Sequence, residues 1–198
     1  MASPGKRHPL LLYARLFAML RPPAFFIALL CGVLWWFAPA RVPLLSSDLA
    51  LTALLVVIVL CALLFLYTLI GPALSYVQCF PTYLLVSTPL FRVAISYSRI
   101  RSVRPVLFTP RDIRWSQRRF LEPFLGMTVV AVYLKSYPLN EKLLRLWLNP
   151  YMFAPDITGF LFHTQDWMAT SRDIDGYRTE WKTRRQQPRP ATPLTGLR

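Results

Sequence analysis

Few side chains in this sequence are suited to acid–base chemistry. The two histidines are His8, near the N-terminus, and His163, in the segment LFHTQDW. His163 could be a catalytic base oriented by Asp166, three residues further on. We expect instead that it is a partly exposed polar residue. Asp173 and Asp175 would diverge by about 200° on a helix of 3.6 residues per turn. They therefore do not form a catalytic carboxylate pair.

The sequence contains no recognisable metal, phosphate or nucleophile motif. The three cysteines lack CxxC spacing, and Cys31 and Cys61 lie inside apolar runs where a small, soft side chain packs well. The seven glycines form no phosphate-binding loop, and G-x-S-x-G does not occur. We therefore expect a protein that is not an enzyme and that has no cofactor and no metal site.

Arginines form the one constellation that could bind a ligand. Eight of them lie within 28 residues, with Asp112 the only acid among them: Arg92, Arg99, Arg101, Arg104, Arg111, Arg114, Arg118 and Arg119. Guanidinium groups bind phosphate and carboxylate in a bidentate manner, and each basic group near an anionic leaflet contributes about 1 kcal/mol. We expect contact with anionic lipid headgroups or a partner protein. The alternative is a solvated basic face that binds nothing in particular.

Two apolar stretches must position this cluster. Residues 49–91 carry no charge, and a bilayer core about 30 Å thick needs about 20 apolar residues as a helix. Pro22–Ala40 would be about 28 Å long at 1.5 Å per residue. We predict transmembrane helices at 22–40 and 49–74, with Pro22 and Pro23 in the first turn, where a missing donor costs nothing. The short link 41–48 makes them an antiparallel hairpin.

The flanking charges predict the orientation of this hairpin. Four basic residues and no acid precede the first span, and most of the net charge of +14 follows the second. Excess Lys and Arg mark the cytoplasmic side, so we expect an integral cell (inner) membrane protein with both termini in the cytoplasm. Membrane lipids are then the nearest partner of the basic residues, and nucleic acid is an unlikely one.

The segment before the first span has two interpretations. Residues 10–20, LLLYARLFAML, form either an interfacial helix or an extension of the first helix from which Arg15 reaches the membrane surface. No clean cleavage site follows the first apolar run, so we expect no removed signal peptide.

Alternation replaces the continuous apolar pattern further along the chain. Residues 91–98 alternate apolar and polar side chains, as a half-buried strand does, and Tyr83–Ser87 is expected to pair with them in a hairpin. Thr128–Leu134 is a β-branched run typical of a buried strand. Leu143–Leu148 also alternates, and we predict a strand there after a turn at 138–142.

The chain is predicted to end in a helix and a tail. Ile174, Tyr177 and Trp181 have helical spacing, which predicts an amphipathic helix at about 171–184. The Pro-rich segment 184–198 has few large apolar groups and is expected to be disordered.

Two segments resemble bacterial pleckstrin-homology-like domains. Tyr83–Val103, YLLVSTPLFRVAISYSRIRSV, is similar to their second-to-fourth strand region, including an S-x-I-x-x-V step at 98–103. Leu144–Pro150, LRLWLNP, resembles their L-x-L-S-P strand end, with Asn149 in place of Ser. The resemblance covers about residues 74–183.

The resemblance departs from the family pattern at one place. Residues 104–127 form a longer and more basic link than the family has between its fourth and fifth strands, which suggests an insertion. Ile100 and Val103 differ in parity, so the strand must bulge or turn between them.

Together these features predict an α+β membrane protein. A two-helix transmembrane hairpin is followed by an antiparallel pleckstrin-homology-like β-barrel or sandwich with a C-terminal helix. The expected parts are a basic N-terminal segment (1–21), the hairpin (22–74), the domain (75–183) and the tail (184–198).

The resemblance also implies a kind of function. Family members often carry one or two preceding hydrophobic helices, and their domains are binding or assembly modules, although fold alone does not fix function. The alternative is an accessory subunit of a larger membrane complex that docks through the Arg-rich segment 92–119. A membrane enzyme would need a polar cluster in the spans, which Tyr67 and Thr68 do not supply.

Overall fold

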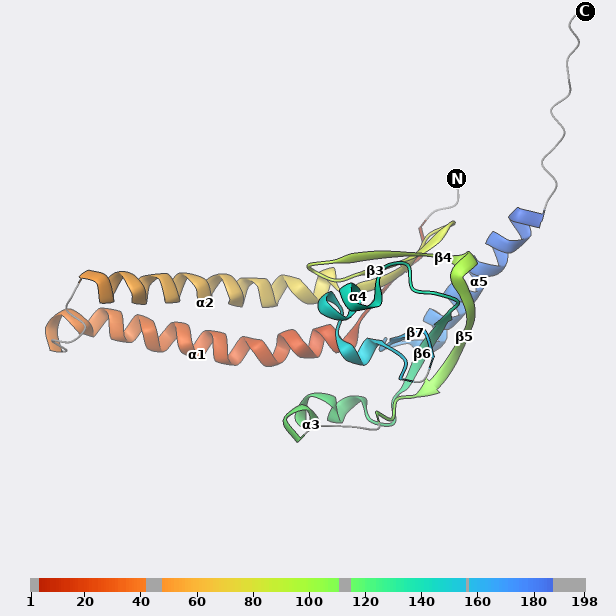
Figure 1. Cartoon of the computed structure of the whole chain (residues 1–198). Coiled ribbons are helices and arrows are strands. Elements are labelled where there is room, and N and C mark those ends of the chain that lie inside the picture. The colour runs from red at the N-terminus through yellow and green to blue at the C-terminus, as the bar shows by residue number, and fades with distance from the viewer. Residues whose placement is uncertain (1–3, 42–47, 111–114, 156, 187–198) are drawn as a thin grey trace, which may run out of the picture.

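The protein is α+β, with two long apolar helices, two antiparallel sheets and a C-terminal helix (Figure 1). The computed structural model describes residues 4–41, 48–110, 115–155 and 157–186. Helices α1 (Leu11–Arg41) and α2 (Asp48–Leu74) lie side by side as an extended hairpin that projects from the domain containing the sheets.

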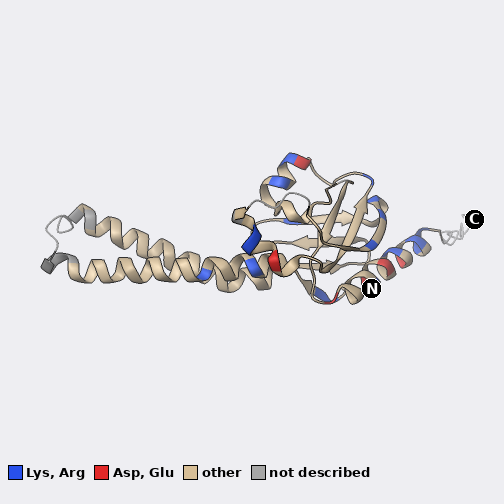
Figure 2. Cartoon of the chain, turned by 90° about the horizontal axis from the view of Figure 1, so that it is seen from below, with Lys and Arg blue, Asp and Glu red and all other residues tan. Residues whose placement is uncertain are grey.

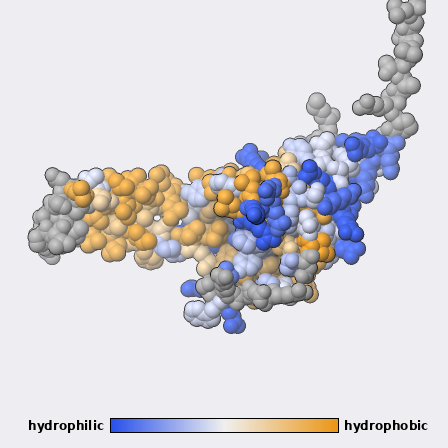
Figure 3. Space-filling view, in the orientation of Figure 1, coloured by the Kyte–Doolittle hydropathy of each residue, from blue (hydrophilic) through white to orange (hydrophobic). Residues whose placement is uncertain are grey.

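Both hairpin helices are long and apolar enough to cross a membrane. Away from the domain they carry almost no charged residue (Figure 2) and present apolar surface (Figure 3). Phe26, Trp36 and Leu60 are among the large apolar side chains exposed there. Helices that are apolar on every face suit a hydrocarbon environment and not water.

Helix α1 begins earlier than the sequence predicts. Pro22 and Pro23 lie inside it and not in its first turn, so that prediction is wrong. Leu12 and Phe17 are buried in the core of the domain, and this packing keeps residues 11–21 helical ahead of the prolines. Proline is tolerated within apolar spanning helices because neighbouring groups satisfy the freed carbonyls. Residues 11–20 are thus an extension of the long helix.

Within the described ranges, seven strands form the two sheets. The first sheet has the order β1 (Arg7–Pro9), β2 (Tyr76–Cys79), β3 (Tyr83–Ser87), β4 (Arg92–Ser96), and the second has the order β5 (Ile100–Leu107), β6 (Thr128–Leu134), β7 (Gly159–Phe162). All neighbours are antiparallel.

The helical hairpin is inserted between two paired strands, β1 and β2. The Leu10 amide donates to the Ser75 carbonyl at 3.0 Å, where the chain leaves the sheet for α1 and returns to it from α2. The first strand of the domain therefore precedes the hairpin in sequence, and the helices grow directly out of the sheet.

Several sequence-based expectations are confirmed. Strands β3 and β4 form the expected hairpin, in which Val86 pairs with Val93. Strand β6 has the predicted bounds, Thr128–Leu134. The register of β5 against β6 shifts between Ile100 and Ser102, which is the irregularity that the parity of this segment required.

The strand predicted at Leu143–Leu148 is wrong, because these residues belong to helix α4 (Glu141–Trp147). Asn140 caps the helix by accepting a hydrogen bond from the Lys142 amide at 3.1 Å. Leu144 and Leu148 are four residues apart, and both are buried on one side. The last strand of the second sheet is instead β7, whose sequence GFLF is buried at every position and therefore shows no alternation.

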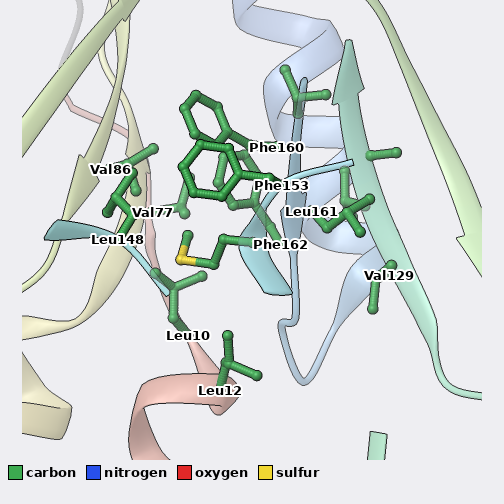
Figure 4. Close-up of a cluster of buried hydrophobic side chains, with 14 of the residues drawn as sticks. Leu10, Leu12, Val77, Val86, Val129, Leu148, Phe153, Phe160, Leu161 and Phe162 are labelled. Atoms are coloured by element: carbon green, nitrogen blue, oxygen red, sulfur yellow. The ribbon is translucent and has the colours of Figure 1, made fainter. Parts of the chain in front are cut away.

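The core lies between the two sheets (Figure 4). Val77 and Val86 enter it from the first sheet, and Phe160 and Phe162 enter it from β7. Leu10 joins them from the end of β1, so the segment before the helical hairpin contributes directly to the core.

Helix α5 (Trp167–Gln186) packs on the second sheet and extends beyond the predicted 171–184 at both ends. Ile174 is fully buried, and the Trp181 ring lies 6.4 Å from the Tyr97 ring. His8 of β1 and Asp173 of α5 form a polar contact, Nε2 to Oδ2, of 2.8 Å. The predicted tail lies outside the described residues from position 187 onward.

Replacing Trp181 by Ala should loosen α5. The side chain is half-buried against the core, so we expect the free energy of unfolding to fall by about 1–2 kcal/mol. Thermal unfolding and limited proteolysis would measure the loss. Lys182→Ala, an exposed neighbour on the same helix, is the matched control. Equal melting temperatures of the two variants would mean that the Trp181 packing contributes nothing to stability.

Candidate functional site

The six arginines of this cluster that the structure describes do not converge on one surface. Arg92 begins β4, Arg99 ends the 3-10 helix η2 (Tyr97–Arg99), Arg101 and Arg104 lie on β5, and Arg118 and Arg119 lie on α3 (Trp115–Leu121). All six are exposed. Arg111 and Arg114 lie outside the described residues.

The arginines divide into two groups in space. Helix α3 and the turn between β3 and β4 lie on the side of the domain nearest the hairpin, whereas β5 lies on the side away from it (Figure 1). Figure 2 likewise shows Lys and Arg at separate places on the domain. Arginines that are close in sequence therefore lie on different faces of the domain, because some belong to β5 and others to α3, which lies between β5 and β6.

Some of these arginines also have structural roles. The Arg99 guanidinium donates to the Tyr137 carbonyl at 2.9 Å and so fastens the start of β5 to the segment after β6. Arg101 and Arg104, with Pro105, lie on an edge strand of the second sheet. Charged residues and proline on an edge strand discourage pairing with another chain. These functions require no ligand.

A groove lies between the end of β5 and the described residues 150–155 and 157. Its volume is about 600 Å³, and its walls include Phe108, Tyr151, Phe153 and Ile157. Among the described residues that line it, Arg145 is the only charged one. Arg145 pairs with Glu141 at 2.8 Å and lies over the Phe153 ring, so its guanidinium group is already engaged at the edge of the groove.

His163 is fully buried, so the expectation of a partly exposed residue is wrong. Its ring lies edge-on to the rings of Phe108, at 4.5 Å, and Phe124, at 5.4 Å. Within the described part of the chain, neither ring nitrogen has a hydrogen-bond partner. Burial lowers the pKa of His163 to about 4, and the nearby Leu161 carbonyl opposes this only in part.

This environment does not support a catalytic role for His163. A neutral imidazole enclosed by aromatic rings has no route to a substrate. The Asp166 carboxylate is engaged elsewhere, because its Oδ1 accepts a hydrogen bond from the Ala169 amide at 2.8 Å at the start of α5. The two residues are therefore not a base and its orienting acid.

The buried Cys79 and Tyr97 are also unsuited to catalysis. Burial raises the pKa of the Cys79 thiol to about 12, so the thiol stays protonated at neutral pH. Burial likewise raises the pKa of Tyr97, whose hydroxyl donates to the Phe80 carbonyl at 2.9 Å. Over the described ranges, no three His, Cys, Asp or Glu side chains gather as a metal site.

Comparisons with protein families, curated proteins and solved structures found no significant match for this chain. Its function must therefore be argued from its own residues.

Proposed function

We propose that this protein is a non-enzymatic, membrane-anchored binding or assembly module with a pleckstrin-homology-like domain on the cytoplasmic membrane surface. The observation that carries the proposal is the apolar helical hairpin that emerges from the paired strands β1 and β2. An anchor joined to a domain through neighbouring strands holds that domain close to the membrane.

Architecture and charge support this proposal. Two antiparallel sheets with a helix packed on the second agree with the domain type suggested by Tyr83–Val103. Lys6, Arg7, Arg15 and Arg21 precede or begin the first apolar span, as expected when the domain and both termini are cytoplasmic. Arg21 binds the Thr68 carbonyl of α2 at 2.9 Å, which fixes the two helices to each other near the domain.

The positions of the six described arginines suggest their partners. Arg92, Arg118 and Arg119 lie on elements near the hairpin, where anionic headgroups are within reach of their guanidinium groups. Arg99, Arg101 and Arg104 lie at or on β5, away from the hairpin. For this second group, contact with an acidic partner protein is the better assignment.

Lipid enrichment around the full-length protein tests this division. In nanodiscs that contain dansyl-labelled phosphatidylglycerol or phosphatidylcholine, energy transfer from tryptophan should report enrichment of the anionic lipid. Changing Arg92, Arg118 and Arg119 together to Gln should weaken that enrichment by about 1 kcal/mol for each arginine. Raising the salt concentration from 0.1 to 1 M should do the same, because the Debye length falls from about 10 to about 3 Å.

The matched control removes the same charge from the other group, by changing Arg99, Arg101 and Arg104 to Gln. This variant should retain the lipid enrichment. If both triple variants enrich phosphatidylglycerol as the parent does, the lipid role fails. The accessory-subunit alternative would then be favoured. It predicts that a stoichiometric partner protein co-purifies with the parent after mild detergent extraction. The variant with Gln at positions 99, 101 and 104 should lose that partner.

A further inference from the structure

The most exposed large apolar side chains outside the two hairpin helices belong to three separate elements. Among the described residues, Trp115 of α3 is 89% exposed, Leu146 of α4 is 74% exposed, and Leu90 in the turn between β3 and β4 is 69% exposed. Single exposed apolar residues are ordinary on protein surfaces. The position of these three is therefore what matters.

All three elements lie at the end of the domain from which the hairpin projects. Figure 1 shows α3, α4 and the β3–β4 turn around the base of the two helices. The Phe91 ring stacks on the Trp147 ring at 6.1 Å, which places the turn and α4 side by side. In Figure 3, apolar surface is seen again beside the base of the helices, near α4 and the β3–β4 turn, whereas the region of α3 is largely hydrophilic or grey.

Hydrogen bonds within the β3–β4 turn fix the exposed position of Leu90. Thr88 closes the turn, because its backbone amide and its side-chain hydroxyl both donate to the Phe91 carbonyl at 2.8 Å. The Phe91 amide in turn donates to the Thr88 hydroxyl at 3.2 Å. Pro89 further restricts the backbone. The turn thus holds Leu90 outward in a fixed position.

Helix α4 is apolar on two sides. Leu144 faces the core and is fully buried, whereas Leu143, Leu146 and Trp147 are exposed. A surface helix with one apolar neighbour needs only one apolar stripe. The second apolar side of α4 indicates a second apolar neighbour, and the helix itself lies at the base of the hairpin (Figure 1).

Basic residues accompany these apolar side chains. Arg92 follows the turn, Lys142 lies on α4, and Arg118 and Arg119 lie on α3. Tryptophan and leucine next to Lys and Arg are typical of segments that lie in the interface between headgroups and acyl chains. The same membrane that takes up the hairpin supplies that interface.

We propose that Leu90, Trp115 and Leu146 insert into the headgroup–acyl boundary of the membrane that the hairpin crosses. This inference rests on the proposed membrane anchoring. Insertion at three points around the hairpin holds one face of the domain against the bilayer. Strand β5 and the C-terminal half of α5 then face the cytoplasm, where they are available to other molecules.

Quenching by nitroxide-labelled lipids tests the insertion in the full-length protein in nanodiscs. Cys31 and Cys61 are changed to Ala, while the buried, protonated Cys79 can stay. An NBD fluorophore is attached at Leu90→Cys or Leu146→Cys in separate proteins. Val59→Cys in α2 reports membrane insertion of the hairpin, and Thr183→Cys on exposed α5 reports the cytoplasmic background.

We expect lipids labelled near the headgroup to quench NBD at positions 90 and 146 at least twofold more than at 183, and lipids labelled deep in the acyl chain to quench it at position 59, near the middle of α2. Quenching at position 59 with the background level at 90 and 146 would overturn the inference and leave the anchor intact. A blue-shifted but unquenched fluorophore at 90 or 146 would also overturn it, because a protein would then cover the surface. Absence of quenching at 59 would overturn the anchoring itself.

Discussion

Residues 75–186 expressed alone should not fold into a stable domain. This fragment lacks β1, so the edge of β2, a strand buried along its whole length, would face solvent. It also lacks the core side chains of Leu10, Leu12 and Phe17. Truncation of one buried leucine costs about 2–5 kcal/mol, and a domain has about 5–15 kcal/mol in total. We therefore expect aggregation or a non-cooperative thermal transition measured by circular dichroism.

A shortened hairpin is the matched control. In this variant a short Gly/Ser linker joins residues 4–21 to residues 67–186. The variant keeps β1 and the buried first turns of α1. The linker has little distance to cover, because the Arg21 side chain reaches the Thr68 carbonyl. Phe17 also keeps its edge-to-face contact with Tyr67 at 5.5 Å. This protein should unfold cooperatively, and a fragment 75–186 that melts at the same temperature would show that β1 is dispensable.

The position of the helical hairpin between the paired strands β1 and β2 is the part of the fold that the sequence does not predict. Local patterns were sufficient for Thr128–Leu134 and for the helix that contains Ile174, because the periodicity of each segment reflects its own burial. Strand β1 consists of Arg, His and Pro, and it pairs with residues 76–78 across the whole hairpin. No local pattern signals a strand whose stability comes entirely from a distant partner.

Two further elements show how a correct pattern can predict the wrong structure. In Leu143–Leu148, alternation agreed with a strand, but Leu144 and Leu148 also have helical spacing. The Asn140-Glu141 pair was the signal of a helix start. The sequence does not predict strand β7, because the segment GFLF is buried on both faces and so lacks the alternation of apolar and polar residues.

The arrangement of the candidate site residues in space does not follow from their spacing in the sequence. The six described arginines are close in sequence but not in space, since β4 and α3 carry some toward the hairpin and β5 carries others away from it. His163 was expected to be partly exposed because histidine is polar. The apolar run Gly159–Phe162 immediately before it was the available indication that the chain is deeply buried there.

Acidification should destabilise the domain through His163. The pKa of this side chain is lowered from 6.5 to about 4 in the folded protein, because burial between Phe108 and Phe124 disfavours the charged ring. Below pH 6.5 the unfolded chain binds a proton at this position and the folded chain does not. The stability from neutral His163 is therefore complete above pH 6.5 and is lost as the pH falls toward 4.

The expected loss is about 3 kcal/mol, since a pKa difference of one corresponds to 1.36 kcal/mol. His163→Leu removes the titrating group and leaves an apolar side chain of similar size among the same aromatic rings. The free energy of unfolding of the full-length variant in nanodiscs should then depend less on pH between 4 and 6.5. His8, which contacts Asp173, is present in both proteins, so the difference between them isolates His163. Parallel stability curves for the parent and the variant would show that the buried imidazole is not the group that acid protonates on unfolding.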